Sequence, residues 1–119
     1  MAQSDFYDLV IIGGGPAGLA TALHLADRAP ALAADTIILE KNDHPRPKLC
    51  GGGITFHGEQ QLNRLGLELD VPAVTVHRLE FRLGKRAFTV KSPAAMRIIQ
   101  RAQFDAALAD AVRRRGISV

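Results

Sequence analysis

A short apolar run that ends in three consecutive glycines limits the folds open to this chain more than any other feature. Residues 9–12 read Leu-Val-Ile-Ile, and Gly13, Gly15 and Gly18 follow with the spacing G-x-G-x-x-G. A β-branched run without polar alternation is typical of a parallel strand buried on both faces. In a dinucleotide-binding turn the first glycine allows the tight bend, the second admits a pyrophosphate, and the third lets the helix pack on the strand. The sequence therefore predicts a strand, a phosphate-binding turn and a helix.

The predicted helix begins at Pro16 and Ala17. A proline suits the first turn because its missing N–H would find no partner there. The free N–H groups of that turn and the positive end of the helix dipole favour phosphate. Apolar residues recur at helical spacing in Leu19, Ala22, Leu23 and Ala26. Pro30 predicts the end of the helix near residues 28–30.

A second apolar run, Thr36–Leu39, ends in Glu40. Glu40 follows Gly18 at about the 20-residue spacing that is expected of a ribose-binding acid. A carboxylate there would accept hydrogen bonds from ribose hydroxyls and repel a 2′-phosphate, which favours FAD or NAD over NADP. The alternative is a glycine turn in an ordinary α/β domain, with an acid at a strand end by coincidence.

Composition narrows the classes of function. The chain has 119 residues, enough for one domain at most, and its 47% of hydrophobic residues is ordinary for a globular protein. The net charge of +3 includes the run Arg113–Arg115, which is typical of a solvated helix end. No aromatic residues alternate with these arginines, so we expect no nucleic-acid partner. The single cysteine, Cys50, excludes an internal disulfide and fits a reducing, cytoplasmic compartment.

Residues 9–26 are apolar enough to imitate a signal peptide or a membrane span. However, Asp5 and Asp8 precede them where a signal peptide needs positive charge, and glycines and a proline interrupt the run. We therefore expect no transmembrane segment. We also expect no metal site, because the four histidines lack metal-ligand spacing and a matching set of carboxylates or cysteines. These histidines are His24, His44, His57 and His77.

Residues 41–53 contain two prolines and three glycines, which exclude regular structure. Loops of more than about 12 residues in compact domains are usually binding loops or disordered. Arg46 and Lys48 supply charge suited to a pyrophosphate, and residues 51–53 offer backbone N–H groups to a ligand. The segment is therefore a candidate binding loop.

The remainder predicts a helix, a hairpin and a second helix. The first helix is expected from Ile54 to Leu65, with Gly66 as its stop. Its inward side chains would be Phe56, Leu62 and Leu65. Apolar and polar residues alternate in 74–81 and 86–90, which predicts a β-hairpin with one wet face. The second helix would carry an apolar stripe, end at Gly116 and lead into a strand from Ile117; the stripe is Phe104, Leu108, Ala111 and Val112.

Asp105 lies near the start of this second helix. A carboxylate in that position complements the helix dipole. We interpret Asp105 in this way rather than as a catalytic acid.

Four segments together resemble a known family. They are the apolar and glycine run at 8–19, Ile-Leu-Glu-Lys at 38–41, Pro-Arg-Pro-Lys-Leu-Cys-Gly-Gly-Gly at 45–53, and Arg-Ala-Gln-Phe-Asp-Ala-Ala-Leu at 101–108. In these segments the chain resembles geranylgeranyl reductase-type FAD-dependent oxidoreductases. That group shares the p-hydroxybenzoate hydroxylase FAD domain with flavin monooxygenases and flavin-dependent halogenases.

The resemblance implies an α/β fold. It predicts a Rossmann-like βαβ FAD-binding domain with a parallel sheet and a small β-hairpin. Residues 1–119 would be a truncated N-terminal part of that domain, with the substrate domain absent. The family pattern also makes Met96 to Ile99 extended, whereas Ser92 and Pro93 alone suggest the start of a helix.

The resemblance also implies FAD as the cofactor. It places the three motif glycines at the pyrophosphate, Glu40 at the adenosine ribose, and Arg101 facing the cofactor. Cys50 would lie near the isoalloxazine; the alternative for a lone cysteine is a small buried hydrophobe. The expected cofactor-binding residues are Gly13, Gly15, Pro16, Ala17, Gly18, Glu40, Lys41, Lys48, Cys50, Gly51 and Arg101. No residue is assigned a catalytic role.

The parent protein implied by the resemblance is an FAD-dependent oxidoreductase with a small-molecule substrate, and the 119 residues alone are expected to be inactive. The parent would reduce an isoprenoid alkene, or hydroxylate or halogenate an aromatic ring; an isoprenoid lipid would add peripheral membrane association. The alternatives are a non-catalytic nucleotide-binding module that needs a partner chain, and an NAD-binding Rossmann domain. No segment remains to pair with the second edge of residues 9–12, so we expect self-association or pairing with a missing C-terminal portion.

Overall fold

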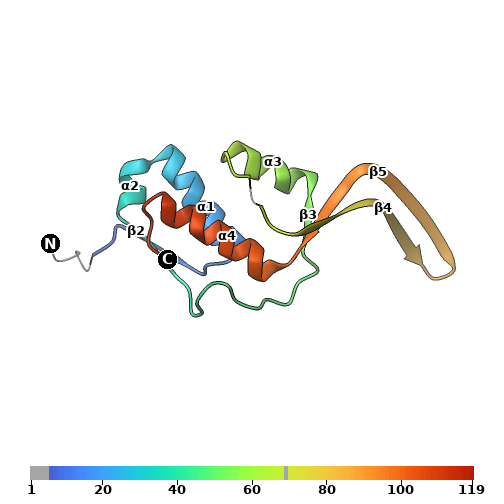
Figure 1. Cartoon of the computed structure of the whole chain (residues 1–119), viewed down its shortest axis with the longest axis horizontal. Helices are drawn as coiled ribbons and strands as arrows, with labels where there is room; N and C mark the ends of the chain where they lie inside the picture. The colour runs from blue at the N-terminus through green and yellow to red at the C-terminus, as the bar shows by residue number, and fades with distance from the viewer. Residues whose placement is uncertain (1–5, 69) are drawn as a thin grey trace.

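A helix-covered pair of parallel strands forms one end of the molecule, and a long antiparallel hairpin projects from the other (Figure 1). The computed structural model describes residues 6–68 and 70–119. Its elements, in chain order, are β1 (Leu9–Ile12), α1 (Pro16–Arg28), α2 (Pro30–Ala34), β2 (Thr36–Leu39), β3 (Gly53–Thr55), α3 (Phe56–Arg64), β4 (Ala73–Leu83), β5 (Arg86–Ile99) and α4 (Arg101–Arg114). The mixed α/β fold expected from the sequence is confirmed.

The parallel pair has the predicted order. β1 and β2 are in register from Leu9 opposite Thr36 to Ile12 opposite Leu39. Ser118 adds a parallel bridge to β2 on the far side, and its carbonyl accepts a 2.9 Å hydrogen bond from the Ile38 N–H. Among the described residues, β1 pairs with β2 alone, so its other edge is open.

The expectation that β1 is buried on both faces is wrong for this chain. Its side chains alternate between half-buried and exposed, and Val10 and Ile12 are 47% and 87% exposed. Ile11 packs against the core instead. The reason is that helices cover only one face of the strand pair.

The core lies between α1, α4 and the covered face of β2. Leu19 and Leu23 of α1 pack with Leu108 and Val112 of α4, and all four are nearly or fully buried. Figure 1 shows α1 and α4 running side by side over the strands. The apolar stripes predicted for both helices are confirmed. Their packing holds the start of α1 at the carboxyl ends of β1 and β2.

The element boundaries agree with the sequence prediction in part. α1 ends at Arg28, as predicted, but Pro30 also begins the short helix α2, because a proline is accepted in a first helical turn. The next helix begins at Phe56 rather than Ile54, since Gly53–Thr55 pairs with β5 as β3. Thr55 caps this helix by accepting a 3.3 Å hydrogen bond from the Gly58 N–H. Phe56 is 63% exposed, so its predicted inward position is also wrong.

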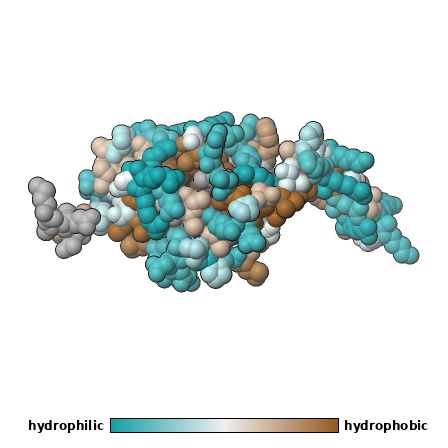
Figure 2. Space-filling view, viewed as in Figure 1, coloured by the Kyte–Doolittle hydropathy of each residue, from teal (hydrophilic) through white to brown (hydrophobic). Residues whose placement is uncertain are grey.

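The hairpin is longer than the alternation predicted. β4 and β5 pair from Ala73 opposite Ile99 to Leu83 opposite Arg86, which confirms the extended conformation of Met96 to Ile99. The prediction of one wet face fails in residues 81–90, which are all exposed because none of the described segments covers the outer hairpin. The face seen in Figure 2 is mostly hydrophilic there. None of the described helices is both long enough and apolar enough to cross a membrane.

Candidate functional site

The three motif glycines have three different geometries. Gly13 has a φ of +106°, a conformation that residues with a Cβ rarely adopt. A Cβ on Gly18 would lie 2.1 Å from the Gly13 carbonyl oxygen, so this glycine lets α1 pack on the turn. A Cβ on Gly15 would meet only ordinary contacts, with Arg46 and Arg101 at 3.7 and 3.8 Å. These geometries match the bend, the close packing and the open approach that a dinucleotide turn needs.

The turn opens into a groove at the carboxyl ends of β1 and β2, where open α/β sheets bind ligands. The groove has a volume of about 460 Å³. Six of the predicted site residues line it: Gly13, Gly15, Glu40, Lys41, Lys48 and Arg101. Gly15 is the N-cap of α1 and Pro16 follows it, with no side chain capping the helix. The start of the helix therefore faces the groove without a competing carboxylate in its first turn.

Glu40 is held in place at the end of β2. Its carboxylate accepts hydrogen bonds from the N–H groups of Gly14 at 2.9 Å and Asn42 at 3.1 Å. Arg46 adds an ion pair at 3.3 Å. Burial by itself would raise the pKa of the Glu40 carboxyl, but these three donors outweigh burial and lower the pKa below its ordinary value. Glu40 is therefore a fixed anion within the groove.

Gly14 is a site residue that the motif spacing did not mark. A Cβ there would lie 2.9 Å from the Cβ of Glu40 and 3.0 Å from the ring of His44. The Gly14 carbonyl accepts hydrogen bonds from His44 at 2.8 Å and Arg46 at 3.2 Å. The loop after β2 thus contacts both backbone polar groups of Gly14. Three consecutive glycines were the only sequence signal for it.

Two arginines meet one buried aspartate behind the groove. Asp105 is fully buried, and it accepts hydrogen bonds from Arg101 at 2.8 and 2.9 Å and from Arg46 at 3.1 Å. This pairing raises the pKa of Arg101, which stays charged. The interpretation of Asp105 as a partner of the helix dipole is wrong, because the two guanidinium groups take up its charge. Arg46 lines the groove, where its charge was expected, but its side chain is only 7% exposed because it also contacts Asp105, Gly14 and Glu40.

A second hollow, of about 360 Å³ and largely apolar, lies on the other side of Arg101. Pro16, Cys50, Phe104 and Leu108 contribute to it, and Arg101 lines both hollows. Cys50 is exposed, so the alternative of a buried hydrophobe is wrong. Hydrogen bonds from the Gly52 N–H, at 3.4 Å, and from Arg101 lower the pKa of its thiol below the ordinary value.

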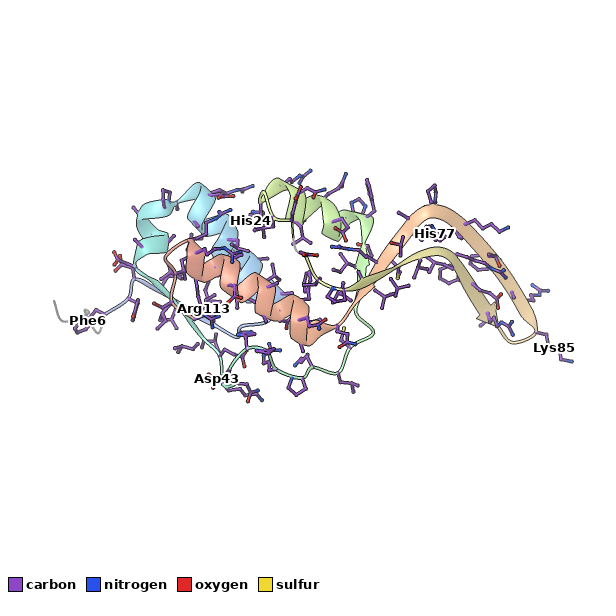
Figure 3. All side chains as sticks on the ribbon, in the orientation of Figure 1. Phe6, His24, Asp43, His77, Lys85 and Arg113 are labelled. Atoms are coloured by element: carbon purple, nitrogen blue, oxygen red, sulfur yellow. The ribbon has the colours of Figure 1, made fainter. Side chains whose placement is uncertain are left out.

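The remaining predicted site residues lie outside both hollows. Ala17 is exposed on α1, Gly18 packs beneath the turn, and Gly51 is exposed in the loop. This loop connects β2 to β3, and Asp43 lies in its first half (Figure 3). His24 lies on α1 and His77 on the hairpin, so these two rings are far from one another (Figure 3).

Comparison with known proteins agrees with this geometry. Residues 8–69 match the family described as FAD dependent oxidoreductase. Over 67 residues the chain is 39% identical to menaquinone reductase of Mycobacterium tuberculosis. That match covers 56% of this chain and 15% of the relative, so the chain spans only a small part of the length of the curated relatives.

Solved structures match over nearly the whole chain. A geranylgeranyl bacteriochlorophyll reductase-like protein from Thermoplasma acidophilum superposes with a TM-score of 0.75 at 25% identity, over 96% of this chain and 29% of that one. A flavin-dependent brominase superposes with a TM-score of 0.75 at 26% identity, over 95% of this chain and 28% of that one. The family match covers more than half of the residues, and it includes the glycine turn and Glu40. The chain therefore belongs to the family of FAD-dependent oxidoreductases.

Proposed function

We propose that residues 1–119 are the N-terminal part of the FAD-binding domain of a flavin-dependent oxidoreductase. In this proposal the adenosine ribose lies at Glu40 and the pyrophosphate at Gly13, Gly15 and the start of α1. Lys41, Lys48 and Arg101 supply positive charge along the groove. The observation that carries the proposal is the position of Glu40. Its carboxylate lines the groove and accepts hydrogen bonds from the N–H groups of Gly14 and Asn42.

The chemistry of the two hollows supports an amphiphilic ligand. The groove at Glu40 combines charged side chains with the apolar Ile12, Leu39 and Pro47, whereas the hollow at Cys50 is largely apolar, and Arg101 lines both. FAD has a charged adenosine diphosphate half and a flat, largely apolar ring. Bound FAD supplies the redox chemistry, and the protein supplies binding, orientation and electrostatics.

Among possible reactions of the parent protein, we favour reduction of an isoprenoid-type substrate. The relatives named menaquinone reductase and geranylgeranyl bacteriochlorophyll reductase-like support it. The similar brominase supports a second candidate, halogenation or hydroxylation of an aromatic ring. We place the parent in the cytoplasm, with peripheral membrane association if its substrate is an isoprenoid lipid.

Two other readings make different predictions about ligands. An NAD-binding Rossmann domain would bind NAD as well as it binds FAD and would make no use of the Cys50 loop. A non-catalytic nucleotide-binding module would bind ADP without preferring a flavin dinucleotide. The proposal predicts that FAD binds more tightly than ADP, since only FAD reaches both hollows.

Equilibrium titration of the purified chain with FAD tests the proposal, followed by the visible absorption of the flavin. ADP should compete with FAD, and FMN, which has the flavin ring but no adenosine, should bind far more weakly. NAD serves as the matched dinucleotide control. Binding of FMN equal to that of FAD, or no competition by ADP, would contradict the placement of the adenosine half at Glu40.

A further inference from the structure

Arg46 joins three parts of the site that are distant in the sequence. Its Nη1 donates a 3.1 Å hydrogen bond to Asp105 of α4. Its Nη2 contacts the Gly14 carbonyl at 3.2 Å and the Glu40 carboxylate at 3.3 Å. One guanidinium therefore connects the glycine turn, the end of β2 and the second helix of the core.

Arg46 lines the groove, but these contacts direct its guanidinium toward the protein. Both terminal nitrogens have protein partners, and the side chain is only 7% exposed. Arg101 differs: its side chain is 17% exposed, and it contacts Asp105 through Nε and Nη2. The fork geometry of that pair fixes the plane of the Arg101 guanidinium, and Arg101 lines both hollows.

The backbone of Gly14 is held at both its N–H and its carbonyl. Its N–H donates to Glu40 at 2.9 Å, and its carbonyl accepts from Arg46 at 3.2 Å. Arg46 also contacts Glu40, so Gly14, Glu40 and Arg46 each contact the other two. The fully buried Asp105 carboxylate pairs with the other terminal nitrogen of Arg46, Nη1, and so connects these contacts to α4.

We propose that Arg46 and Asp105 are positioning residues, which hold the Gly14 backbone, Glu40 and Arg101 in the arrangement that receives the diphosphate and ribose of an adenine dinucleotide; Arg46 lines the groove, and Asp105 acts from behind it. The proposal rests on the function proposed above, and it deepens it. A buried ion pair is not in general a source of stability, and fixing one geometry is among the best-attested uses of such a group.

Charge and positioning make opposite predictions for Asp105→Asn. If Asp105 acts only through its charge, removing an anion near the diphosphate should tighten ADP binding. If it positions Arg46 and Arg101, the amide replaces one of the two acceptor oxygens with an NH2 donor that faces a guanidinium N–H, and ADP binding should weaken. We expect about a tenfold loss, the size of one hydrogen bond to a charged group.

The experiment uses residues 1–119 with ADP as the probe, and it measures affinity by calorimetry and backbone order by hydrogen–deuterium exchange. Asp105→Asn should weaken ADP binding and speed exchange in segments 13–15 and 40–46 without ADP present. Asp110→Asn is the matched control, since it removes the same charge from an exposed position on the same helix. Equal or tighter ADP binding by Asp105→Asn would overturn the proposal.

Arg46→Lys keeps the charge but not the fork, and it tests the proposal if Asp105→Asn fails to fold. It should show the same tenfold loss and the same faster exchange. Arg97→Lys is its control, because Arg97 makes a two-point ion pair with Glu59 outside the groove. Failure of the unmodified chain to bind ADP would count against the proposed function, whereas unchanged exchange in Arg46→Lys would count against the positioning role alone.

Discussion

The Gly14 amide and the Glu40 carboxylate lie 26 positions apart in the chain and are joined by a 2.9 Å hydrogen bond. This bond links the phosphate-binding turn after β1 to the acid at the end of β2. In the family to which the chain belongs, the cofactor is FAD. The ribose and pyrophosphate sites of the proposed complex are therefore directly connected by this bond.

Glu40→Ala should weaken FAD binding. It removes the proposed acceptor for the ribose hydroxyls and the partner of the Gly14 N–H, and loss of such a charge-assisted hydrogen bond costs about 1.5–3 kcal/mol, or roughly ten- to a hundredfold in affinity. The unmodified chain should also reject NADP, because Glu40 would repel its 2′-phosphate. Titrations of both chains with FAD and NADP check this. Asp43→Ala, in the same loop and exposed, is the control, and equal FAD affinities of Glu40→Ala and the unmodified chain would remove Glu40 from the site.

Gly15→Val and Gly18→Ala should fail in different ways. A Cβ at Gly15 has ordinary contacts in the free chain, so Gly15→Val should fold but lose FAD binding because its side chain fills the approach to the turn. At Gly18 the added carbon would lie 2.1 Å from a backbone oxygen, so Gly18→Ala should be destabilised by at least about 1–3 kcal/mol. Thermal unfolding and FAD titration separate the two effects. A Gly15→Val chain that still binds FAD would show that the turn does not receive the pyrophosphate.

Cys50 should react with iodoacetamide at lower pH than an ordinary cysteine. The Gly52 N–H and Arg101 stabilise its thiolate, and the lowered pKa means that the reactive form persists as the pH falls below the usual value of 9.0. Arg101→Gln should move the midpoint of the rate–pH profile upward. The same chain in urea gives the reference profile, and a folded profile identical to it would contradict the contact with Arg101.

The free edge of β1 should promote self-association. β1 pairs with β2 alone among the described residues, and Val10 and Ile12 expose apolar surface beside the unpaired backbone. Size-exclusion chromatography at several concentrations should show species larger than a monomer. Ile12→Lys, which places a charge on that face, should shift the distribution toward the monomer. A concentration-independent monomer of the unmodified chain would contradict this expectation.

Local features of the sequence predicted local parts of the structure. The bend at Gly13, the stripes of α1 and α4, the pairing of β1 with β2 and the position of Glu40 all follow from short-range spacing. The contact between Arg46 and Asp105 could not be predicted in this way, because the two lie 59 positions apart and neither shows a periodic signal. For the same reason the sequence did not indicate that Arg46 has protein partners as well as a place in the groove.

Tertiary pairing also explains the errors at the element boundaries. β3 has only three residues, and its strand conformation comes from pairing with β5 rather than from its own composition. Because of that pairing, α3 begins at Phe56 rather than at the predicted Ile54, and Phe56 is exposed. The exposure of Val10 and Ile12 has a similar origin, since an apolar run predicts burial but cannot say which faces this chain covers.

Hydrogen–deuterium exchange of the 119-residue chain with and without saturating ADP tests the central claim most directly. The account predicts slower exchange on ADP binding in residues 13–19 and 40–48, which contain the turn, the start of α1 and the Glu40 loop. The hairpin of residues 73–99 should not change. Protection confined to the hairpin, or no protection in 13–19 and 40–48 at a concentration where ADP binds, would contradict the account.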